Sequence, residues 1–136
     1  MERNELLMEI RVDCGEAVSV RGQETAVVMV PFTGTTEGAY FCGKTVGAGV
    51  DTQRIGQDGK TRLSARYMLE GQDAAGNACR IFIENQGGWE EGFTPRIVTD
   101  SPLLKDWETA DLGATVEEIP GGVLVRIFRK QKREKQ

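Results

Sequence analysis

Apolar and polar residues alternate with a period of two along several short stretches of this chain. In residues 6–13 the even positions are apolar, and Glu9, Arg11 and Asp13 lie between them. Because successive side chains of a β-strand point to opposite faces, this pattern predicts a half-buried strand. Residues 63–69 and 112–119 alternate in the same way. The chain is therefore predicted to consist mainly of strands.

Further strands are predicted from short apolar runs between turn signals. Residues 25–32 and 78–85 are too short for a convincing helix and are rich in strand-forming side chains. Residues 39–55 contain several glycines, which disfavour a helix and predict two short, bent strands. The turn signals Asp58–Gly59 and Pro120–Gly122 each indicate a hairpin. Residues 93–99 and 123–128 are the remaining predicted strands.

Short strands spaced about ten residues apart predict a sandwich or a barrel, and closure into a barrel removes exposed strand edges. We expect an all-β, antiparallel, up-and-down β-barrel domain over residues 1–128, with a sandwich as the alternative. One short helix is predicted near residues 101–109, capped by Asp100 or Ser101, with Trp107 in the core.

The charge distribution separates the body of the chain from its end. Residues 129–136 contain five of the 17 Lys and Arg residues but one of the 21 Asp and Glu residues, and are predicted to form a basic C-terminal tail. The remaining body is acidic, which argues against a nucleic-acid partner. No apolar stretch reaches the length of a membrane span or a signal peptide, so we expect a cytoplasmic protein without a membrane partner.

The residue types present exclude several chemistries. The chain contains no histidine, which removes histidine-based triads and imidazole metal ligands. Cys14, Cys42 and Cys79 form no Cys-x-x-Cys pair and are expected to be buried thiols. No phosphate-binding or dinucleotide-binding motif is present. We therefore expect neither a metal nor a cofactor.

Carboxylates remain as candidates for acid–base chemistry, because a dry cavity can raise a carboxyl pKa. Glu37, Asp51 and Glu84 lie in or beside strand-like sequence, and Arg66 interrupts a strand. Each side chain could face water or the lumen of a barrel, and alternation alone does not decide between them. Trp89 and Phe93 could likewise cover a barrel mouth or fill one end.

Four strings of residues, in their order and spacing, resemble the domain-of-unknown-function 3237 family, a set of small bacterial and fungal proteins. The resemblance extends from about Leu6 to Phe128, and Thr52 replaces the tryptophan typical of the second string. The strings are Val30–Gly38, Gly47–Gln53, Ala65–Leu69 and Ile83–Gly87.

This resemblance implies a calycin-like or lipocalin-like barrel with an interior cavity, and little about activity. Carried over by position, the residues expected to line the cavity are Glu37, Asp51, Gln53, Arg66 and Asn85.

Three functions remain open. The first is binding of a small, partly apolar ligand in the cavity, with Arg66 as an anion partner. The second is a cofactor-free lyase, isomerase or cyclase in which Asp51 or Glu37 moves a proton and Arg66 stabilises negative charge. The third is a homo-oligomeric structural or interaction protein.

Overall fold

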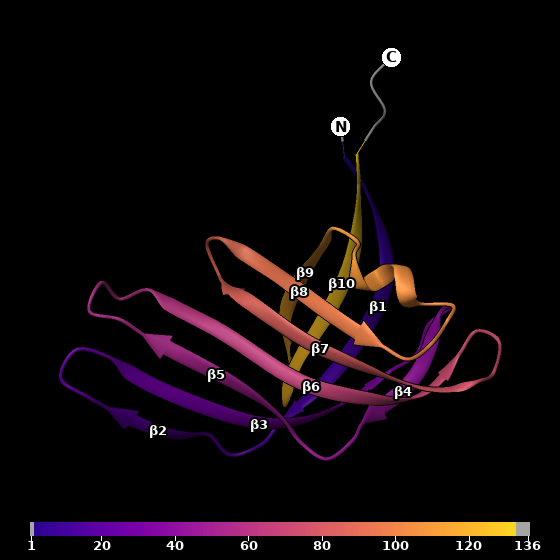
Figure 1. The fold of residues 1–136 in the computed structure, drawn as a ribbon. Helices are drawn as coiled ribbons and strands as arrows, with labels where there is room; N and C mark the ends of the chain where they lie inside the picture. The colour runs from indigo at the N-terminus through magenta and orange to yellow at the C-terminus, as the bar shows by residue number, and fades with distance from the viewer. Residues whose placement is uncertain (1, 133–136) are drawn as a thin grey trace.

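The strands of the chain form one antiparallel sheet that closes into a barrel-like ring (Figure 1). A computed structural model describes residues 2–132. The elements are β1 (Glu2–Cys14), β2 (Val18–Arg21), β3 (Ala26–Thr36), β4 (Phe41–Thr45), β5 (Gly49–Ile55), β6 (Thr61–Asp73), β7 (Ala78–Gly88), β8 (Gly92–Thr99), the 3-10 helix η1 (Lys105–Glu108), β9 (Leu112–Ile119) and β10 (Gly122–Lys132).

Neighbouring strands in the ring follow the order of the chain almost throughout. From β6 to β10 each strand pairs with the next, β10 pairs with β1, and β1 pairs with β3 through residues 10–14. Every pairing is antiparallel. The prediction of an all-β, antiparallel up-and-down barrel is confirmed.

Strands β4 and β5 together occupy one position in the wall. Residues 26–32 of β3 pair with β5, whereas Thr35 and Thr36 pair with β4. The break between the two strands contains Gly47, whose φ of +68° is a left-handed conformation that glycine adopts without steric cost. The two short strands predicted within residues 39–55 are confirmed.

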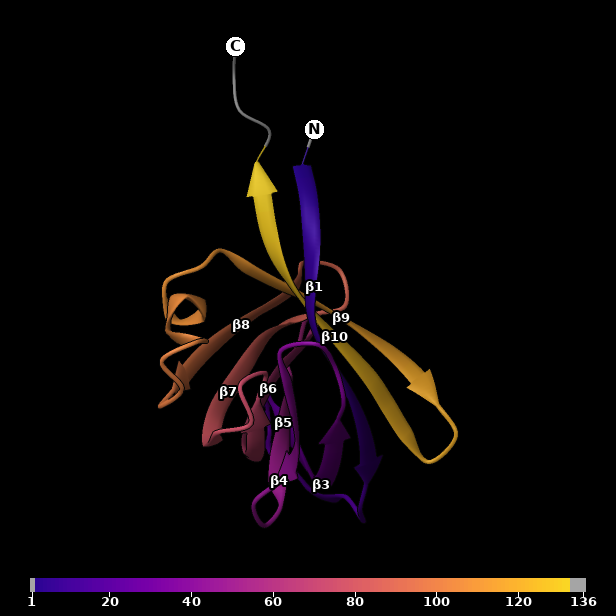
Figure 2. The same ribbon diagram turned by 90° about the vertical axis from the view of Figure 1, so that its right-hand side faces the viewer.

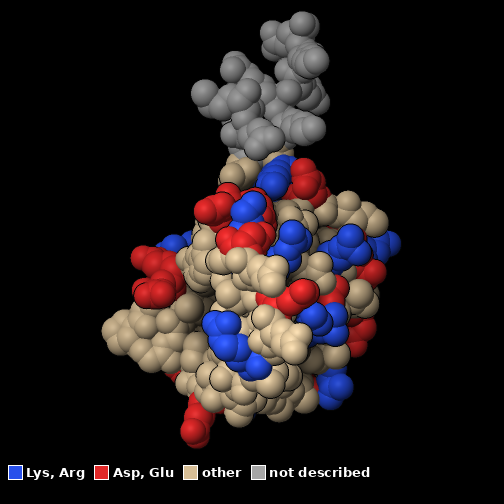
Figure 3. Space-filling model, turned by 90° about the vertical axis from the view of Figure 1, so that its left-hand side faces the viewer, with Lys and Arg blue, Asp and Glu red and all other residues tan. Residues whose placement is uncertain are grey.

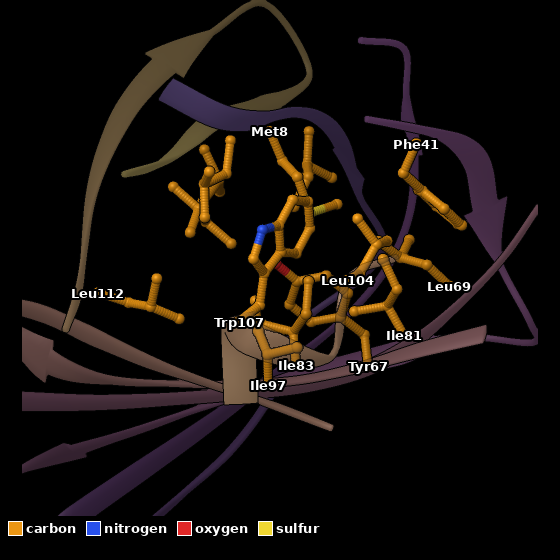
Figure 4. Close-up of a cluster of buried hydrophobic side chains, with 14 of the residues drawn as sticks. Met8, Phe41, Tyr67, Leu69, Ile81, Ile83, Ile97, Leu104, Trp107 and Leu112 are labelled. Carbon is orange, nitrogen blue, oxygen red and sulfur yellow. The ribbon is translucent and has the colours of Figure 1, made fainter. Parts of the chain in front are cut away.

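One end of the barrel is filled by a close-packed apolar core (Figure 4). Ile10, Leu69, Ile81, Ile83 and Ile127 are completely buried there. Burial of a side chain of this size contributes about 1.5–3 kcal/mol relative to exposure. This end therefore supplies much of the stabilisation of the fold.

The segment between β8 and β9 covers the packed end. Its turns are closed by i to i+3 hydrogen bonds, from Leu104 N to Ser101 O at 3.1 Å and from Trp107 N to Leu104 O at 2.9 Å. Side chains three residues apart eclipse one another in 3-10 geometry, so Leu104 and Trp107 both point into the core. The predicted helix near residues 101–109 is thus a single 3-10 turn, and Trp107 lies in the core.

Strands β1 and β10 extend beyond the rest of the barrel as a two-stranded ribbon (Figure 2). Residues 129–132, predicted to belong to a basic tail, continue β10, and Arg129 Nε lies 3.2 Å from Glu5 Oε1. The pairing with β1 continues through Lys132, so the strand does not end at Phe128 as predicted. The remaining tail residues, 133–136, lie outside the described residues.

Two of the three cysteines differ from the expectation of burial. Only Cys79 is buried, whereas Cys14 and Cys42 are exposed. Cys42 follows Phe41, which points into the core, so alternation turns its thiol outward. Cys14 ends β1 at the end of the barrel away from the packed core.

Among residues 2–132, no helix has the length and apolar character that a membrane crossing needs.

Asp73 ties the β6–β7 turn to the segment after β8. Its Oδ1 accepts hydrogen bonds from the backbone N–H groups of Ala75 at 3.0 Å and Asn77 at 3.1 Å, and its Oδ2 accepts one from Ser101 Oγ at 2.8 Å. The hydrogen bond from Ser101, followed by those from the backbone, lowers the pKa of Asp73 below its ordinary value. A carboxyl whose pKa falls on folding stabilises the fold above its unfolded pKa and loses that contribution as the pH falls.

We therefore predict that Asp73→Asn lowers the melting temperature at pH 7, and that the difference from the unsubstituted protein shrinks below about pH 4. Thermal melts across this pH range, with Asp106→Asn as an exposed control, measure the effect. A difference that stays constant down to low pH would contradict the role assigned to the ionised carboxylate.

Candidate functional site

The end of the barrel opposite the packed core is hollow. Strands β8 and β9 pair only at Phe93 and Ala114, and the β9–β10 hairpin splays away from β8 (Figure 2). The interior at this end contains a cavity of about 210 Å³. Its lining comprises Val12, Cys14, Val30, Phe32, Asp51, Gln53, Leu63, Ala65, Tyr67, Asn85, Trp89, Phe93, Val116, Glu118, Val123 and Val125.

An aromatic pair separates this cavity from the packed core. The rings of Phe32 and Tyr67 meet edge to face, with centroids 5.2 Å apart. Gly49 makes room for them, because a Cβ atom there would lie 2.6 Å from Phe32 Cζ and 2.7 Å from Tyr67 Cβ. Glycine at position 49 therefore allows the Phe32–Tyr67 pair to pack as the floor of the cavity.

Above this floor the strand register brings two polar residues onto one row of the wall. Asp51 on β5 is opposite Ala65 on β6, which is opposite Asn85 on β7. All three line the cavity, and the small side chain of Ala65 leaves space between the two polar ones. The row thus places a carboxyl group and an amide group on either side of an open position.

Asp51 is a partly buried acid with one neutral partner. Gln53 Nε2 donates a hydrogen bond of 2.9 Å to Asp51 Oδ2. Burial raises the pKa of Asp51, and the hydrogen bond from Gln53 opposes this rise without cancelling it. Asp51 consequently holds its proton to a higher pH than an exposed aspartate, and its ionised form is a stronger base.

Two residues that line the cavity, Tyr67 and Asn85, each carry a buried polar atom without a protein partner. Tyr67 Oη and Asn85 Oδ1 form no hydrogen bond, although both atoms are buried and their residues are only 5% and 6% exposed. A buried polar group without a partner costs about 1–3 kcal/mol, and native proteins contain few of them. Burial also raises the pKa of Tyr67, so its hydroxyl stays protonated and able to donate.

The mouth of the cavity combines aromatic and polar side chains. Trp89, at the tip of the β7–β8 hairpin, is 57% exposed and packs edge to face on Phe93, with ring centroids 5.5 Å apart. The Cys14 thiol also borders the cavity, and its pKa is raised by partial burial and then by the nearby charge of Asp51. A raised thiol pKa makes the reactive thiolate scarcer at neutral pH.

The structure brings together three of the five residues expected to line the interior: Asp51, Gln53 and Asn85. The expectation was wrong for Arg66 and Glu37. Arg66 lies between the inward residues Ala65 and Tyr67, so strand alternation directs it outward, where it pairs with Glu84 at 2.7 Å and is 66% exposed.

Glu37 follows the last residue of β3 in an exposed loop. This loop lies beyond the packed end of the barrel, because Thr36, the residue before it, pairs with Ile10 of the core. Glu37 therefore cannot reach the cavity at the other end. Among the described residues, no group of three or more Cys, Asp or Glu side chains is arranged to hold a metal ion.

Tyr67 and Cys14 were not singled out as site residues by sequence reasoning. Alternation places Tyr67 on the same face as Ala65, but the pattern looks the same for a packed core and for a cavity wall. Ala65 and Tyr67 lie on the same face of β6, and Asp51 lies opposite Ala65 on β5. The signal available for Tyr67 was this shared face with Asp51.

Asp51 provides a test of the site that does not require a ligand. A carboxyl whose pKa rises on folding stabilises the fold below its unfolded pKa, and this contribution is lost as the pH rises through the folded value. We predict that Asp51→Asn melts at a higher temperature than the unsubstituted protein at pH 7, with the advantage narrowing toward pH 4. Asp111→Asn, which changes an exposed carboxyl, is the control. A lower melting temperature at pH 7 would argue against a buried, destabilising charge.

Solved structures of several proteins share this fold. A protein of unknown function from Clostridium acetobutylicum superposes with a TM-score of 0.82 at 22% identity, covering 96% of this chain and 100% of that one. An enzyme from Penicillium herquei gives a TM-score of 0.77 at 16% identity, covering 96% and 95%. A β-barrel-like protein from Acinetobacter baumannii gives 0.79 at 17% identity, covering 96% and 97%. At these identities the likeness shows the fold alone.

Sequence comparison identifies the family. A UPF0311 protein of Clostridium acetobutylicum is 42% identical over 55 residues, which span 40% of this chain and 32% of the length of that relative. Residues 3–100 match the family described as "Protein of unknown function (DUF3237)". This match includes Asp51, Gln53, Tyr67 and Asn85, four of the polar residues that line the cavity. The chain belongs to the DUF3237 family of proteins of unknown function.

Proposed function

We propose that this protein binds one small, partly apolar molecule in the hollow end of the barrel. The observation that carries the proposal is the pair of unpartnered buried atoms, Tyr67 Oη and Asn85 Oδ1, which belong to two residues that line the cavity. Groups of this kind lower the stability of the empty protein, and a ligand that bonds to them removes the cost. A polar group of the ligand would lie at this inner position.

The size of the cavity limits the ligand. Its volume of about 210 Å³ is below the roughly 300–1,000 Å³ typical of sites for drug-sized molecules. An occupant the size of one substituted ring fits this space. The valines of β9 and β10, together with Phe93 and Trp89, would contact its apolar part.

The charges around the cavity favour a neutral ligand. No Lys or Arg side chain is among the residues that line it, and Asp51 and Glu118 are acidic. Because Arg66 faces outward, the anion partner expected for a carboxylated ligand is missing from the interior. A hydroxyl or carbonyl group suits the two unpartnered atoms better, since Asn85 Oδ1 accepts and Tyr67 Oη can donate.

Fragment binding tests this proposal. One-ring fragments in matched pairs, such as 4-ethylphenol and ethylbenzene, are titrated while the backbone amide signals of the protein are followed by NMR. We expect the hydroxyl-bearing member of each pair to shift the signals of Ala65 and Asn85 saturably. Tyr67→Phe is expected to weaken its binding about tenfold, the equivalent of one hydrogen bond.

Met68→Leu is the matched control, because Met68 is the neighbour of Tyr67 on β6 and points to the outer face. It should bind the fragments as the unsubstituted protein does. Equal binding by the two members of each pair, or shifts confined to residues outside the cavity, would refute the proposal.

The geometry also favours a second candidate function, cofactor-free proton transfer. Asp51 has a raised pKa and borders the cavity, while the Tyr67 hydroxyl could donate to an oxygen that gains negative charge. Asp51 keeps the role that it was first given as an alternative to Glu37, and Tyr67 takes the role first assigned to Arg66. The Penicillium herquei protein of similar fold is an enzyme, which is compatible with such a role.

Deuterium exchange tests this second function directly. In D₂O, a base at Asp51 that removes a proton next to the carbonyl of bound cyclohexanone would return deuterium to the same carbon. We expect exchange above the protein-free rate, reduced to that rate by Asp51→Asn and unchanged by Asp106→Asn. Exchange that persists in Asp51→Asn would exclude Asp51 as the base.

A further inference from the structure

The outer face of the same wall carries a second hollow, separate from the interior cavity. It is an open groove of about 880 Å³ across β3, β5, β6, β7 and β8, and its arginine, serine and threonine side chains lie on the outer face of these strands. Three arginines border it: Arg54, Arg62 and Arg66. Figure 3 views the end of the molecule where the β5–β6 and β7–β8 hairpins turn, and blue side chains lie next to one another on this face.

Two of these arginines are directly opposite one another. Arg54 on β5 pairs in register with Arg62 on β6, and both are exposed. Opposite residues on neighbouring strands have Cβ atoms about 4.5–5.5 Å apart, and like charges in this position destabilise the sheet. An anion bound between the two guanidinium groups would convert this repulsion into attraction.

Within residues 2–132, neither Arg54 nor Arg62 forms an ion pair with a carboxylate of the chain. Arg66, the next outward arginine on β6, differs because Glu84 neutralises it at 2.7 Å. The cationic character of the groove is therefore concentrated at Arg54 and Arg62.

Neutral donors lie beside the two arginines. Thr52, Ser64 and Gln86 form the next outward row across β5, β6 and β7, and all three line the groove. Ser64 Oγ is buried and has no hydrogen-bond partner. Its hydroxyl, two residues along β6 from Arg62 and on the same face, provides an additional group for a bound oxygen atom.

The position next to Arg62 on β7 is a glycine, and a carboxylate of the chain already approaches it. Leu63 pairs with Gly87, so Arg62 lies beside Gly88. A Cβ atom on Gly88 would be 2.9 Å from Glu91 Oε2, which places this carboxylate above the glycine. Glu91 also lines the groove and would compete with any anion that binds there.

We propose that this outer groove binds an oxyanion, the phosphate or carboxylate group of a small molecule, between the guanidinium groups of Arg54 and Arg62. Planar guanidinium groups bind both kinds of oxyanion through paired N–H donors. A long polyanion fits less well, because residues 1–128 carry 12 basic and 20 acidic residues. The site lies on the opposite face of the wall from the interior cavity and does not depend on a ligand there.

Titration with inorganic phosphate, and separately with acetate, tests the proposal. The Nε–Hε signals of the arginines are followed by NMR at constant ionic strength, with chloride as the reference anion. We expect saturable shifts at Arg54 and Arg62 with at least one of the two oxyanions, and the tighter of the two identifies the ligand chemistry. Shifts that chloride reproduces at equal concentration would overturn the proposal.

Two substitutions with opposite expected effects on oxyanion binding extend the test. Arg62→Gln is expected to weaken oxyanion binding about tenfold, because a charged hydrogen-bond donor is lost. Glu91→Gln is expected to tighten binding, because it removes the competing charge. Arg80→Gln serves as the control, since Arg80 is an exposed arginine that pairs with Glu70 at 2.8 Å outside the groove.

Loss of folding can be separated from loss of the site. Arg62→Gln removes a like-charge pair, so its melting temperature should equal or exceed that of the unsubstituted protein. Arg54→Gln should reproduce both effects and serves as the second variant. Oxyanion binding that is unchanged in both Arg54→Gln and Arg62→Gln would overturn the assignment of the site.

Discussion

The pairing register of β5, β6 and β7 determines what each face of the barrel wall carries. Asp51, Ala65 and Asn85 share one row inside the barrel, whereas Thr52, Ser64 and Gln86 share the next row outside it. Because side chains alternate along a strand, a slip of one residue would exchange the two faces. The interior site and the outer groove are therefore two consequences of a single register.

The two ends of the barrel serve different purposes in physical terms. At one end Ile10, Leu69 and Trp107 pack closely and provide stabilisation. At the other, the wall holds a partly buried acid and two unpartnered polar atoms, all of which lower stability in the empty state. The stabilisation from the packed end offsets the destabilisation from these polar groups. This division favours a function located in the hollow end.

Much of the fold could be predicted from alternation and turn residues, because both are local properties of the chain. The strands around the Asp58–Gly59 turn follow this logic. The inward positions of Asp51, Gln53 and Asn85 were expected from the family resemblance, since alternation alone left the facing of each side chain open. Arg66 was misplaced although its own neighbours, Ala65 and Tyr67, signalled an outward direction. The family resemblance implied a cavity, but the location of the hollow end could not be predicted from alternation, since it depends on how few positions pair between β8 and β9. Alternation does not reveal where a ring of strands stays open.

The central claim is that the hollow end receives a ligand that satisfies Tyr67 and Asn85. A high-resolution crystal structure of the purified protein, combined with mass spectrometry of any molecule that co-purifies with it, tests the claim most directly. The account predicts non-protein density within hydrogen-bond distance of Tyr67 Oη or Asn85 Oδ1. A hollow end closed by the side chains of Trp89 and Phe93, with both polar atoms hydrogen-bonded to the protein itself, would contradict it.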